Sequence, residues 1–573
     1  MKTNPKTAIK KIARIRDKAT ENYLEVIEFP ISKTSVKRLD LSPSVVSEPK
    51  AFLKRLRDAG AILPKDDDQR SNLLSSVARS DPPKDWVYEA QTGWTKSRKA
   101  FVLVDGVIGN TKSKIIGVNR TSSVRDPSGR LSNSGSWKSW RDNVSEPARL
   151  STILMFGICV ALAAPLLAIT NRSSFTICLF GRSRVGKSIA TLLGASAIGL
   201  ARSDDLITWN IKDARLEERI SEFNDALFPI DDLSSMEGSK KKKYQRIRNL
   251  AYRISQGLST ARHSSFTAAH GGVHGSWRSI ALTSSEKPVH ELARLVKLDR
   301  QHGEALRLID LPAVFDGLDH IFDRLPDDLD GSNFGNWKKD EFKKFVDACS
   351  ENHGKAYRKY IKSLIVDRAG LQKYVQAKIA YFVKRVSDES DGDVARDVAE
   401  KFGLIYAGGR LGIRCGLLPW GKPELLDAIS KCYISARELL PDDGVATRQG
   451  ITILKAKLHE LPRLSKKRAR KTDFEKIDGY RRRREKENRY VIKREAFNSI
   501  FASETQRALV TEWLIQRQQI TLATSKESAG APSPGPKEQF KWPDGKRHRS
   551  IEIALPRRQN EKRKQTGAAR KAN

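Results

Sequence analysis

Residues 181–188 read Gly-Arg-Ser-Arg-Val-Gly-Lys-Ser, and this spacing of glycine, lysine and hydroxyl is typical of a phosphate-binding loop. The apolar run 175–180 precedes the loop and the apolar stretch 189–193 follows it, so a strand, the loop and a helix are expected in that order. A chance match in a basic loop is the alternative, which these flanking segments disfavour. The sequence therefore predicts a site for ATP and Mg²⁺, with nucleotide contacts from Gly181, Arg182, Ser183, Arg184, Val185, Gly186, Lys187 and Ser188.

An acidic pair, Asp231-Asp232, follows the apolar run 226–230. ATP hydrolysis needs one carboxylate near the metal and one that orients or deprotonates the attacking water. We assign Asp231, together with the Ser188 hydroxyl, to Mg²⁺, and we assign Asp232 to the water. A turn or helix cap is the alternative, because consecutive aspartates also favour turns.

Two further candidates lie downstream. The strand expected over 277–283 ends in Ser284-Ser285-Glu286, and we expect Ser285 to act beside Lys187 by contacting the γ-phosphate or positioning the water. An ordinary strand-ending turn explains these residues equally well. Arg307 is a candidate arginine finger that reaches the γ-phosphate of a neighbouring subunit, with a plain surface arginine as the alternative.

The charge balance indicates a polyanionic partner. The 573 residues include 105 Lys and Arg against 68 Asp and Glu, a net charge of +37, and nucleic acid is the commonest partner for such an excess. The length predicts three or four domains, and the composition is globular. The five cysteines are scattered and form no Cys-x-x-Cys pair, so neither a zinc site nor a disulfide framework is expected. We recognise no signal peptide and expect a cytoplasmic protein.

One segment, 151–170, is apolar and long enough to cross a bilayer. It contains several small residues and ends just before the strand 175–180, which leaves no room for a membrane span beside the ATP-binding core. We expect a buried helix under that core and no membrane partner.

The order of the elements predicts an α/β protein of several parts. Two helices followed by a β-ribbon near the C-terminus are typical of a winged helix. The expected parts are an N-terminal α/β domain (1–135), a phosphate-loop ATPase core (136–330), a helical lid region (331–445), a basic helical linker (446–488), a winged-helix-like domain (489–556) and a basic disordered tail (557–573).

Basic residues cluster in the C-terminal third, and each phosphate contact from Lys or Arg releases counterions from DNA. We therefore expect DNA, single-stranded or duplex, to be bound there by Lys466, Lys467, Arg481, Arg482, Lys546 and Arg547.

Short segments spread over 35–556 together resemble a known family. They are Gly93-Trp94 with the strand 101–109, Trp140-Arg141, 164–167, the phosphate loop, Trp209, Asn224-Asp225 before Asp231, Trp277-Arg278 with 283–286, 303–310, 402–408 with 418–420, 490–497 and 545–549. This pattern is similar to domain of unknown function 927 (DUF-927), found in bacteria, phages and mobile elements. Its members look like AAA+ replicative helicases of the minichromosome-maintenance type. Two segments depart from the family pattern: Asp231-Asp232 stands where the family usually has Asp-Glu, and Thr283-Ser-Ser-Glu where it has Ser-Thr-Gly-Glu.

The resemblance implies a P-loop AAA+ core built as a three-layer α/β sandwich, which assembles into a ring, expected to be a hexamer, with Arg307 acting in trans. It also implies that the segment 257–274 is a hairpin in the ring channel, where Arg262 follows phosphates and Phe266 contacts bases. The function implied is an ATP-dependent DNA helicase or translocase in the replication or mobilisation of a mobile element. The alternative is an ATP-switched DNA-binding scaffold or loader with little hydrolysis, which the Asp-for-Glu difference keeps open.

Overall fold

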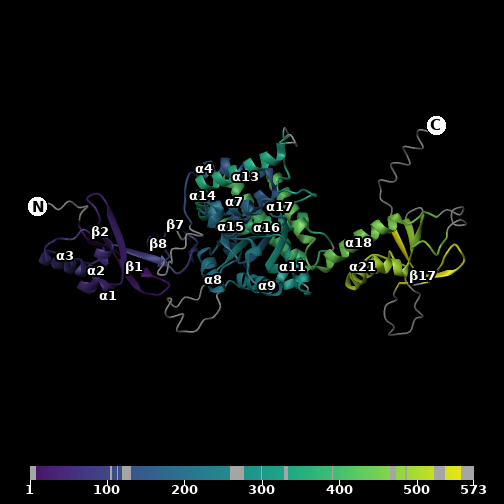
Figure 1. Ribbon diagram of the computed structural model, residues 1–573, viewed down its shortest axis with the longest axis horizontal. Helices are drawn as coiled ribbons and strands as arrows, with labels where there is room; N and C mark the ends of the chain where they lie inside the picture. The colour runs from purple at the N-terminus through teal and green to yellow at the C-terminus, as the bar shows by residue number, and fades with distance from the viewer. Residues whose placement is uncertain are drawn as a thin grey trace. The chain divides into compact units, whose positions relative to one another are not determined.

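The computed structural model shows a mixed α/β chain (Figure 1). It describes residues 8–103, 106–111, 114–118, 131–258, 276–298, 300–327, 329, 333–389, 391–464, 473–483, 487–521, 536–537 and 539–556. The chain divides into two compact units, residues 1–386 with 397–439, and residues 387–396 with 440–573.

The first unit begins with a five-stranded sheet in the order β3-β2-β1-β4-β8. Neighbours β1 to β3 pair antiparallel, whereas β4 pairs parallel with both β1 and β8. Three helices cover one face through a core that includes Phe29, Phe52 and Leu56. The elements are β1 (Lys10–Asp17), β2 (Tyr23–Pro30), β3 (Val36–Leu41), α1 (Pro43–Ser47), α2 (Pro49–Asp58), α3 (Asp67–Arg79), β4 (Asp85–Glu89) and β8 (Lys114–Val118).

A small antiparallel sheet, β5 (Gly93–Trp94), β6 (Ala100–Leu103) and β7 (Gly106–Gly109), packs against helices further along the chain. The Phe101 ring lies between Trp94 and Tyr357 of α14 (Lys355–Val366), with ring centres 5.1 Å and 5.8 Å away and edge-to-face geometry in both pairs. The Trp94 indole N–H donates to the Pro165 carbonyl at 2.9 Å. These contacts attach the small sheet to the central part of the unit.

The central sheet has the strand order β10-β11-β12-β9-β13, and every neighbouring pair is parallel. Its three middle strands are buried along almost their whole length; β9 and β11 are mostly apolar, whereas β12 carries four buried hydroxyl residues among its seven. All carboxyl ends therefore meet at one edge. The elements are β9 (Phe175–Phe180), α7 (Lys187–Ile198), β10 (Ile207–Thr208), α8 (Asp213–Glu222), β11 (Ala226–Asp231), α9 (Lys240–Gln256), β12 (Ser279–Ser285), α11 (Val289–Leu295), α12 (His302–Arg307) and β13 (Leu308–Pro312).

The apolar segment forms α5 (Thr152–Ala163) and α6 (Leu166–Thr170), and every residue of α5 is buried. Gly157 lets α5 approach α7 closely, because a Cβ at this position would lie 2.3 Å from the Ala190 carbonyl oxygen. The buried helix expected here is confirmed. No helix within the described residues is long and apolar enough to span a membrane.

Helices dominate the rest of the first unit and lie around α7 (Figure 1). They are α13 (Phe334–Glu351), α14 (Lys355–Val366), α15 (Arg368–Val386), α16 (Asp393–Arg414) and α17 (Lys422–Arg437). Shorter helical turns are α4 (Trp137–Trp140), η1 (Arg141–Ser145), η2 (Pro147–Leu150), η3 (Ser203–Asp205) and η4 (Leu233–Ser235).

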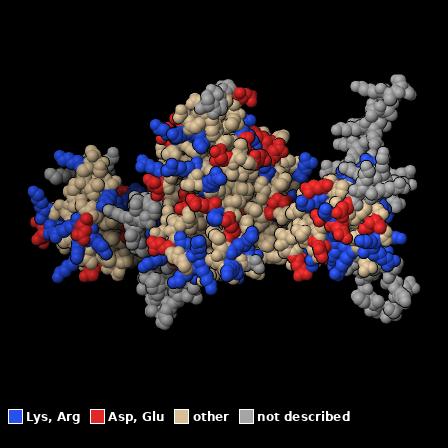
Figure 2. Space-filling view, turned by 45° about the vertical axis from the view of Figure 1, so that its right-hand side comes forward, with Lys and Arg blue, Asp and Glu red and all other residues tan. Residues whose placement is uncertain are grey.

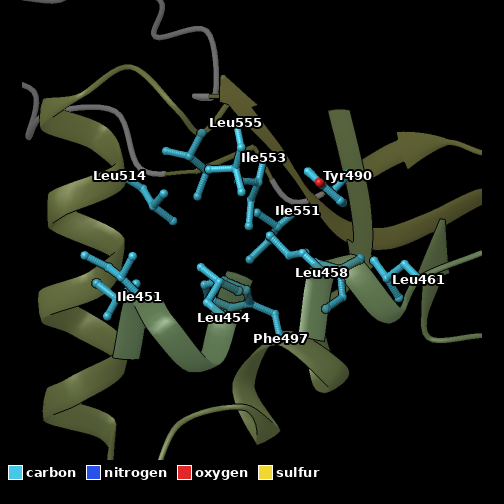
Figure 3. Packing of buried hydrophobic residues seen from close by; sticks show 13 residues of the cluster. Ile451, Leu454, Leu458, Leu461, Tyr490, Phe497, Leu514, Ile551, Ile553 and Leu555 are labelled. Carbon is cyan, nitrogen blue, oxygen red and sulfur yellow. The ribbon is translucent and has the colours of Figure 1, made fainter. Parts of the chain in front are cut away.

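The second unit contains an antiparallel sheet in the order β14-β15-β17-β16. Apolar residues on one face, among them Tyr490 and Ile553, pack against Leu454, Phe497 and Leu514 of three helices (Figure 3). Along the chain, the described elements of this unit are one helix, two strands, two helices and a closing antiparallel pair of strands. The elements are α18 (Asp443–Glu460), β14 (Gly479–Arg483), β15 (Glu487–Lys493), α20 (Arg494–Ser499), α21 (Glu504–Gln516), β16 (Gln539–Lys541) and β17 (Arg547–Pro556).

Two secondary-structure expectations differ from the structure. The single strand expected over 101–109 is instead two antiparallel strands, β6 and β7. The helix expected through 446–488 ends at Glu460, and β14 carries Arg481 and Arg482 as a strand. Pairing with β15 and the packing of Tyr480 against Trp542, at 5.2 Å, outweigh the helical propensity of the basic run.

Candidate nucleotide site

The candidate phosphate loop, residues 181–188, lies at the carboxyl edge of the central sheet, between the end of β9 and the first turn of α7. Its two glycines have positive φ angles, 155° at Gly181 and 118° at Gly186. A Cβ on Gly186 would lie 2.5 Å from Ile321 Cδ1, so the loop needs glycine there for both space and backbone angle. Gly186 immediately precedes α7, so the N–H groups of the first turn point toward the site.

Lys187 is buried beneath this loop and donates hydrogen bonds to the carbonyls of Gly181 and Arg182, each at 2.8 Å. Burial lowers the pKa of its ammonium, an effect that the nearby carboxylates of Glu286, Asp231 and Asp232 oppose. The ammonium is therefore a partly desolvated cation facing acidic groups, a position from which it can bind phosphate oxygens.

Asp231 is the last residue of β11, and its Oδ1 accepts two hydrogen bonds. The Ser284 hydroxyl on the adjacent strand β12 donates at 2.6 Å, and the Asp232 backbone N–H donates at 2.9 Å. Because β12 lies between β11 and β9, Ser284 stands between the acidic pair and the phosphate loop.

Asp232 both caps a helical turn and faces the cavity, which are the two possibilities that the sequence left open. Its side chain lines the same cavity as Lys187, yet its Oδ1 also accepts the Ser234 N–H at 3.0 Å and so caps η4. Its φ of 53° is left-handed, which Asp tolerates better than most residues. A capping contact and a position facing the cavity therefore coexist at this residue.

The expected Ser285 lines the cavity, but its hydroxyl donates to the Lys287 carbonyl at 2.8 Å within its own turn. The contact to the acidic pair comes from Ser284, which the sequence analysis did not select. Successive side chains of a strand point to opposite faces, and only the pairing of β12 between β11 and β9 shows which serine faces Asp231.

These groups line one cavity of about 630 Å³, a size that suits a nucleotide. Ser188 and Asp231 offer the hydroxyl and carboxylate oxygens that Mg²⁺ prefers, so the residues present fit a magnesium nucleotide. The lining consists of Ser183, Arg184, Gly186, Lys187, Ser188, Ile189, Asp231, Asp232, Ser234, Ser284, Ser285, Glu286, Lys338, Lys339 and Phe342; Gly181, Arg182 and Val185 belong to the loop without lining this cavity.

Helix α13 contributes three lining residues that sequence reasoning missed: Lys338, Lys339 and Phe342. A Cβ on Gly186 would lie 2.9 Å from the Phe342 ring, which shows how closely α13 approaches the loop. Nothing in the spacing of these residues relative to the loop indicates the contact, because it depends on how α13 packs on α7.

Arg307 lies away from this cavity. It immediately precedes β13, so it stands at the amino edge of the sheet, opposite the phosphate loop. Its guanidinium stacks 4.4 Å from the Tyr252 ring centre and donates to the Gly303 carbonyl at 2.6 Å. The structure does not bring Arg307 to the nucleotide cavity of its own chain.

The expected DNA contacts are described only in part, since Arg262, Phe266, Lys466 and Lys467 fall outside the described residues. The Arg482 guanidinium stacks 5.0 Å from the Tyr480 ring centre on β14. Arg481 is half-buried on the same strand, whereas Lys546 and Arg547 are exposed at the turn into β17. Figure 2 shows lysine and arginine side chains spread over the visible face, with acidic residues among them.

Part of this chain matches a model of a known protein family. A family model described as "Domain of unknown function (DUF927)" matches residues 3–272, just under half of the chain. The resemblance inferred from short segments is confirmed over that stretch, and the segments from Trp277 onward lie beyond it. A comparison with curated protein sequences finds no match.

A solved structure titled "SCCmec type IV Cch - active helicase" is similar over 96% of this chain and 93% of its own, with a TM-score of 0.52 and 14% identity. At this identity the likeness shows a shared fold, and it extends over nearly the whole chain. Two structures of the NrS-1 C terminal region, at 11% identity, cover 69% of this chain and 86% or 87% of their own. Their TM-score of 0.25 is too low to support an argument.

Proposed function

We propose that this protein is an ATP-dependent DNA helicase or translocase of the AAA+ type. The observation that carries the proposal is the convergence of the phosphate loop, Lys187, Asp231 and Ser284 on one nucleotide-sized cavity. The strand order supports it, because β12 separates the loop strand β9 from the acidic strand β11 and places a polar side chain between the two. The DUF927 match and the fold shared with a protein titled a helicase point in the same direction.

Each residue of the site has a separate role in the proposed binding and hydrolysis of ATP. Lys187 transfers its hydrogen bonds from the loop carbonyls to the β and γ phosphate oxygens, and the amides at the start of α7 bind the same anion. Ser188 and Asp231 would hold Mg²⁺, which would neutralise charge on the phosphates when bound. Ser284 holds the Asp231 carboxylate in place, and Asp232 orients the attacking water.

The position of Arg307 at the opposite edge of the sheet supports a role in a neighbouring subunit, and hence a ring, which we propose to be hexameric. The net charge of +37 and the winged-helix order of the second unit support DNA as the partner. The DUF927 resemblance favours a role in the replication or mobilisation of a mobile genetic element.

A second candidate function, an ATP-switched DNA scaffold with little hydrolysis, is favoured by one observation. The Asp232 carboxylate is engaged in capping η4 and is one methylene shorter than glutamate, so it is less free to reach a water molecule. This candidate predicts ATP-dependent assembly on DNA without rapid turnover.

The test is ATP turnover by the full chain with and without single-stranded DNA, together with unwinding of a forked duplex. We expect turnover that DNA stimulates and that Lys187→Ala abolishes while circular dichroism stays unchanged. Wild-type turnover in Lys187→Ala would contradict the nucleotide site. Tight ATP binding with negligible turnover in the wild type would favour the scaffold.

A further inference from the structure

A second polar cavity, of about 660 Å³, lies at the amino edge of the central sheet, opposite the nucleotide site. Part of its lining comes just before the strands of that sheet: Ser174 before β9, Asn224 and Asp225 before β11, and Trp277 and Arg278 before β12. Residues of the nucleotide cavity, in contrast, follow the same strands. The two cavities therefore occupy opposite ends of one sheet.

A buried hydrogen-bond network joins three distant segments at the floor of this cavity. The Asn224 side chain donates to the Thr92 carbonyl at 2.7 Å and accepts the Arg278 N–H at 2.7 Å. The Asp225 carboxylate accepts the Trp94 N–H at 3.1 Å. Since Asn224 and Asp225 are both about 5% exposed, this floor is a fixed part of the fold.

Gly93 makes the close approach of these segments possible. A Cβ at this position would lie 2.6 Å from both Asn224 Nδ2 and Asp225 Oδ2, and its φ of 94° also favours glycine. Gly93-Trp94, Asn224-Asp225 and Trp277-Arg278 were three separate segments of the family resemblance. The nucleotide site uses none of them, and the structure brings them together here.

Positive charge dominates the lining. Among the described lining residues, four are cations, Lys96, Arg98, Arg172 and Arg278, and one, Asp225, is a carboxylate. Arg172 is paired with Glu400 at 2.7 Å, and Arg98 donates to the Ala168 carbonyl at 3.1 Å. Within the described residues, neither Lys96 nor Arg278 has a carboxylate at salt-bridge distance. Arg278 acts electrostatically on the Asp225 carboxylate without forming an ion pair with it, so Lys96 and Arg278 are the two cations of the lining that an anion can bind.

We propose that this cavity binds a backbone phosphate of a nucleic-acid single strand through Lys96 and Arg278. Its volume accommodates one nucleotide unit, and Lys and Arg are the usual contacts of backbone phosphates. The half-buried Trp94 offers an aromatic surface beside them, with its ring held by the bond to Pro165. The proposal deepens the proposed function, on which it rests, by naming a contact for the translocated strand.

The test is titration of fluorescein-labelled oligothymidylate with the full chain at several salt concentrations. We expect Lys96→Gln and Arg278→Gln each to weaken binding about tenfold and to lower the slope of log affinity against log salt by about one. Asp225→Asn removes the only acidic lining residue described and is expected to strengthen binding. Lys373→Gln, an exposed lysine of α15 outside the cavity, is the matched control and should change neither quantity.

The outcomes separate this proposal from the one on which it rests. Unchanged affinity and slope in both Lys96→Gln and Arg278→Gln, with a wild type that binds DNA, would overturn the phosphate site alone. Absence of DNA binding by the wild type would overturn both proposals. Lys96 is exposed, so Lys96→Gln remains informative if Arg278→Gln disturbs folding. Displacement of the oligonucleotide by inorganic phosphate at equal phosphate concentration would assign the cavity to a free anion instead.

Discussion

The Ser284 hydroxyl donates a 2.6 Å hydrogen bond to Asp231 Oδ1 across two neighbouring parallel strands. Ser285, one residue later, directs its hydroxyl to the Lys287 carbonyl instead. This difference between adjacent serines supplies a matched pair of variants.

Ser284→Ala should lower ATP turnover more than Ser285→Ala does. A hydrogen bond to a charged group contributes about 1.5–3 kcal/mol, so we expect a loss of roughly 10- to 100-fold in kcat if the bond holds Asp231 in its reactive position. Steady-state kinetics of both variants provide the measurement. A larger loss in Ser285→Ala would restore Ser285 as the residue that acts on the γ-phosphate.

The two aspartates should respond differently to substitution. Asp231→Ala removes a proposed Mg²⁺ ligand and should weaken magnesium-nucleotide binding, whereas Asp232→Asn should bind ATP and turn it over poorly. Asp232→Glu lengthens the side chain toward the water and is expected to raise the rate. Binding of a fluorescent ATP analogue, compared with turnover, distinguishes these effects. Full activity in both Asp231→Ala and Asp232→Asn would place the acidic site elsewhere.

Lys338→Ala and Lys339→Ala should each raise the KM for ATP several-fold, because each removes a positive charge from the part of the cavity wall that α13 forms beside the phosphate loop. Lys343→Ala, an exposed lysine of the same helix outside the cavity, is the control. A KM equal to that of the wild type in all three variants would show that α13 covers the site without binding ATP.

Asp225 should make stability depend on pH. Burial is the main reason that its pKa rises from 3.8 to about 6, against the opposing effect of the Trp94 N–H, Arg278 and Arg98. The folded state therefore holds this proton more tightly than the unfolded state, and the free energy of unfolding falls by about 3 kcal/mol as the pH rises from about 4 through 6. Asp225→Asn should remove this loss, so its Tm should exceed that of the wild type more at pH 7.5 than at pH 4.5. The same advantage at both pH values would contradict the shift.

DNA affinity should be steeply salt-dependent and should depend on the second unit. Deleting 489–573 removes Lys546 and Arg547 together with most of β15 and all of α20, α21, β16 and β17, so duplex binding should weaken while basal ATP turnover stays within several-fold. Filter-binding titrations of both chains at several salt concentrations measure this. Equal affinities with a flat salt slope would contradict DNA docking on this unit.

Local sequence was sufficient wherever the signal lies within one short segment. The spacing around Gly181, Gly186 and Lys187 predicts a loop between strand and helix because those backbone angles and contacts are local. The buried helix before β9 follows in the same way from a continuous apolar run. Asp231-Asp232 could be placed at a strand end, since the strand is apolar along its whole length.

Tertiary structure decided everything that depends on which strands and helices become neighbours. Ser284 rather than Ser285 contacts Asp231 because β12 lies between β11 and β9. Lys338 reaches the cavity because of how α13 packs on α7. Neither contact produces a pattern in the local sequence. The basic run near Arg481 became a strand because pairing with β15 outweighs its own propensity. Gly93, Asp225 and Arg278 lie far apart in the sequence, and only the parallel sheet, which collects the amino ends of its strands at one edge, brings them to one cavity.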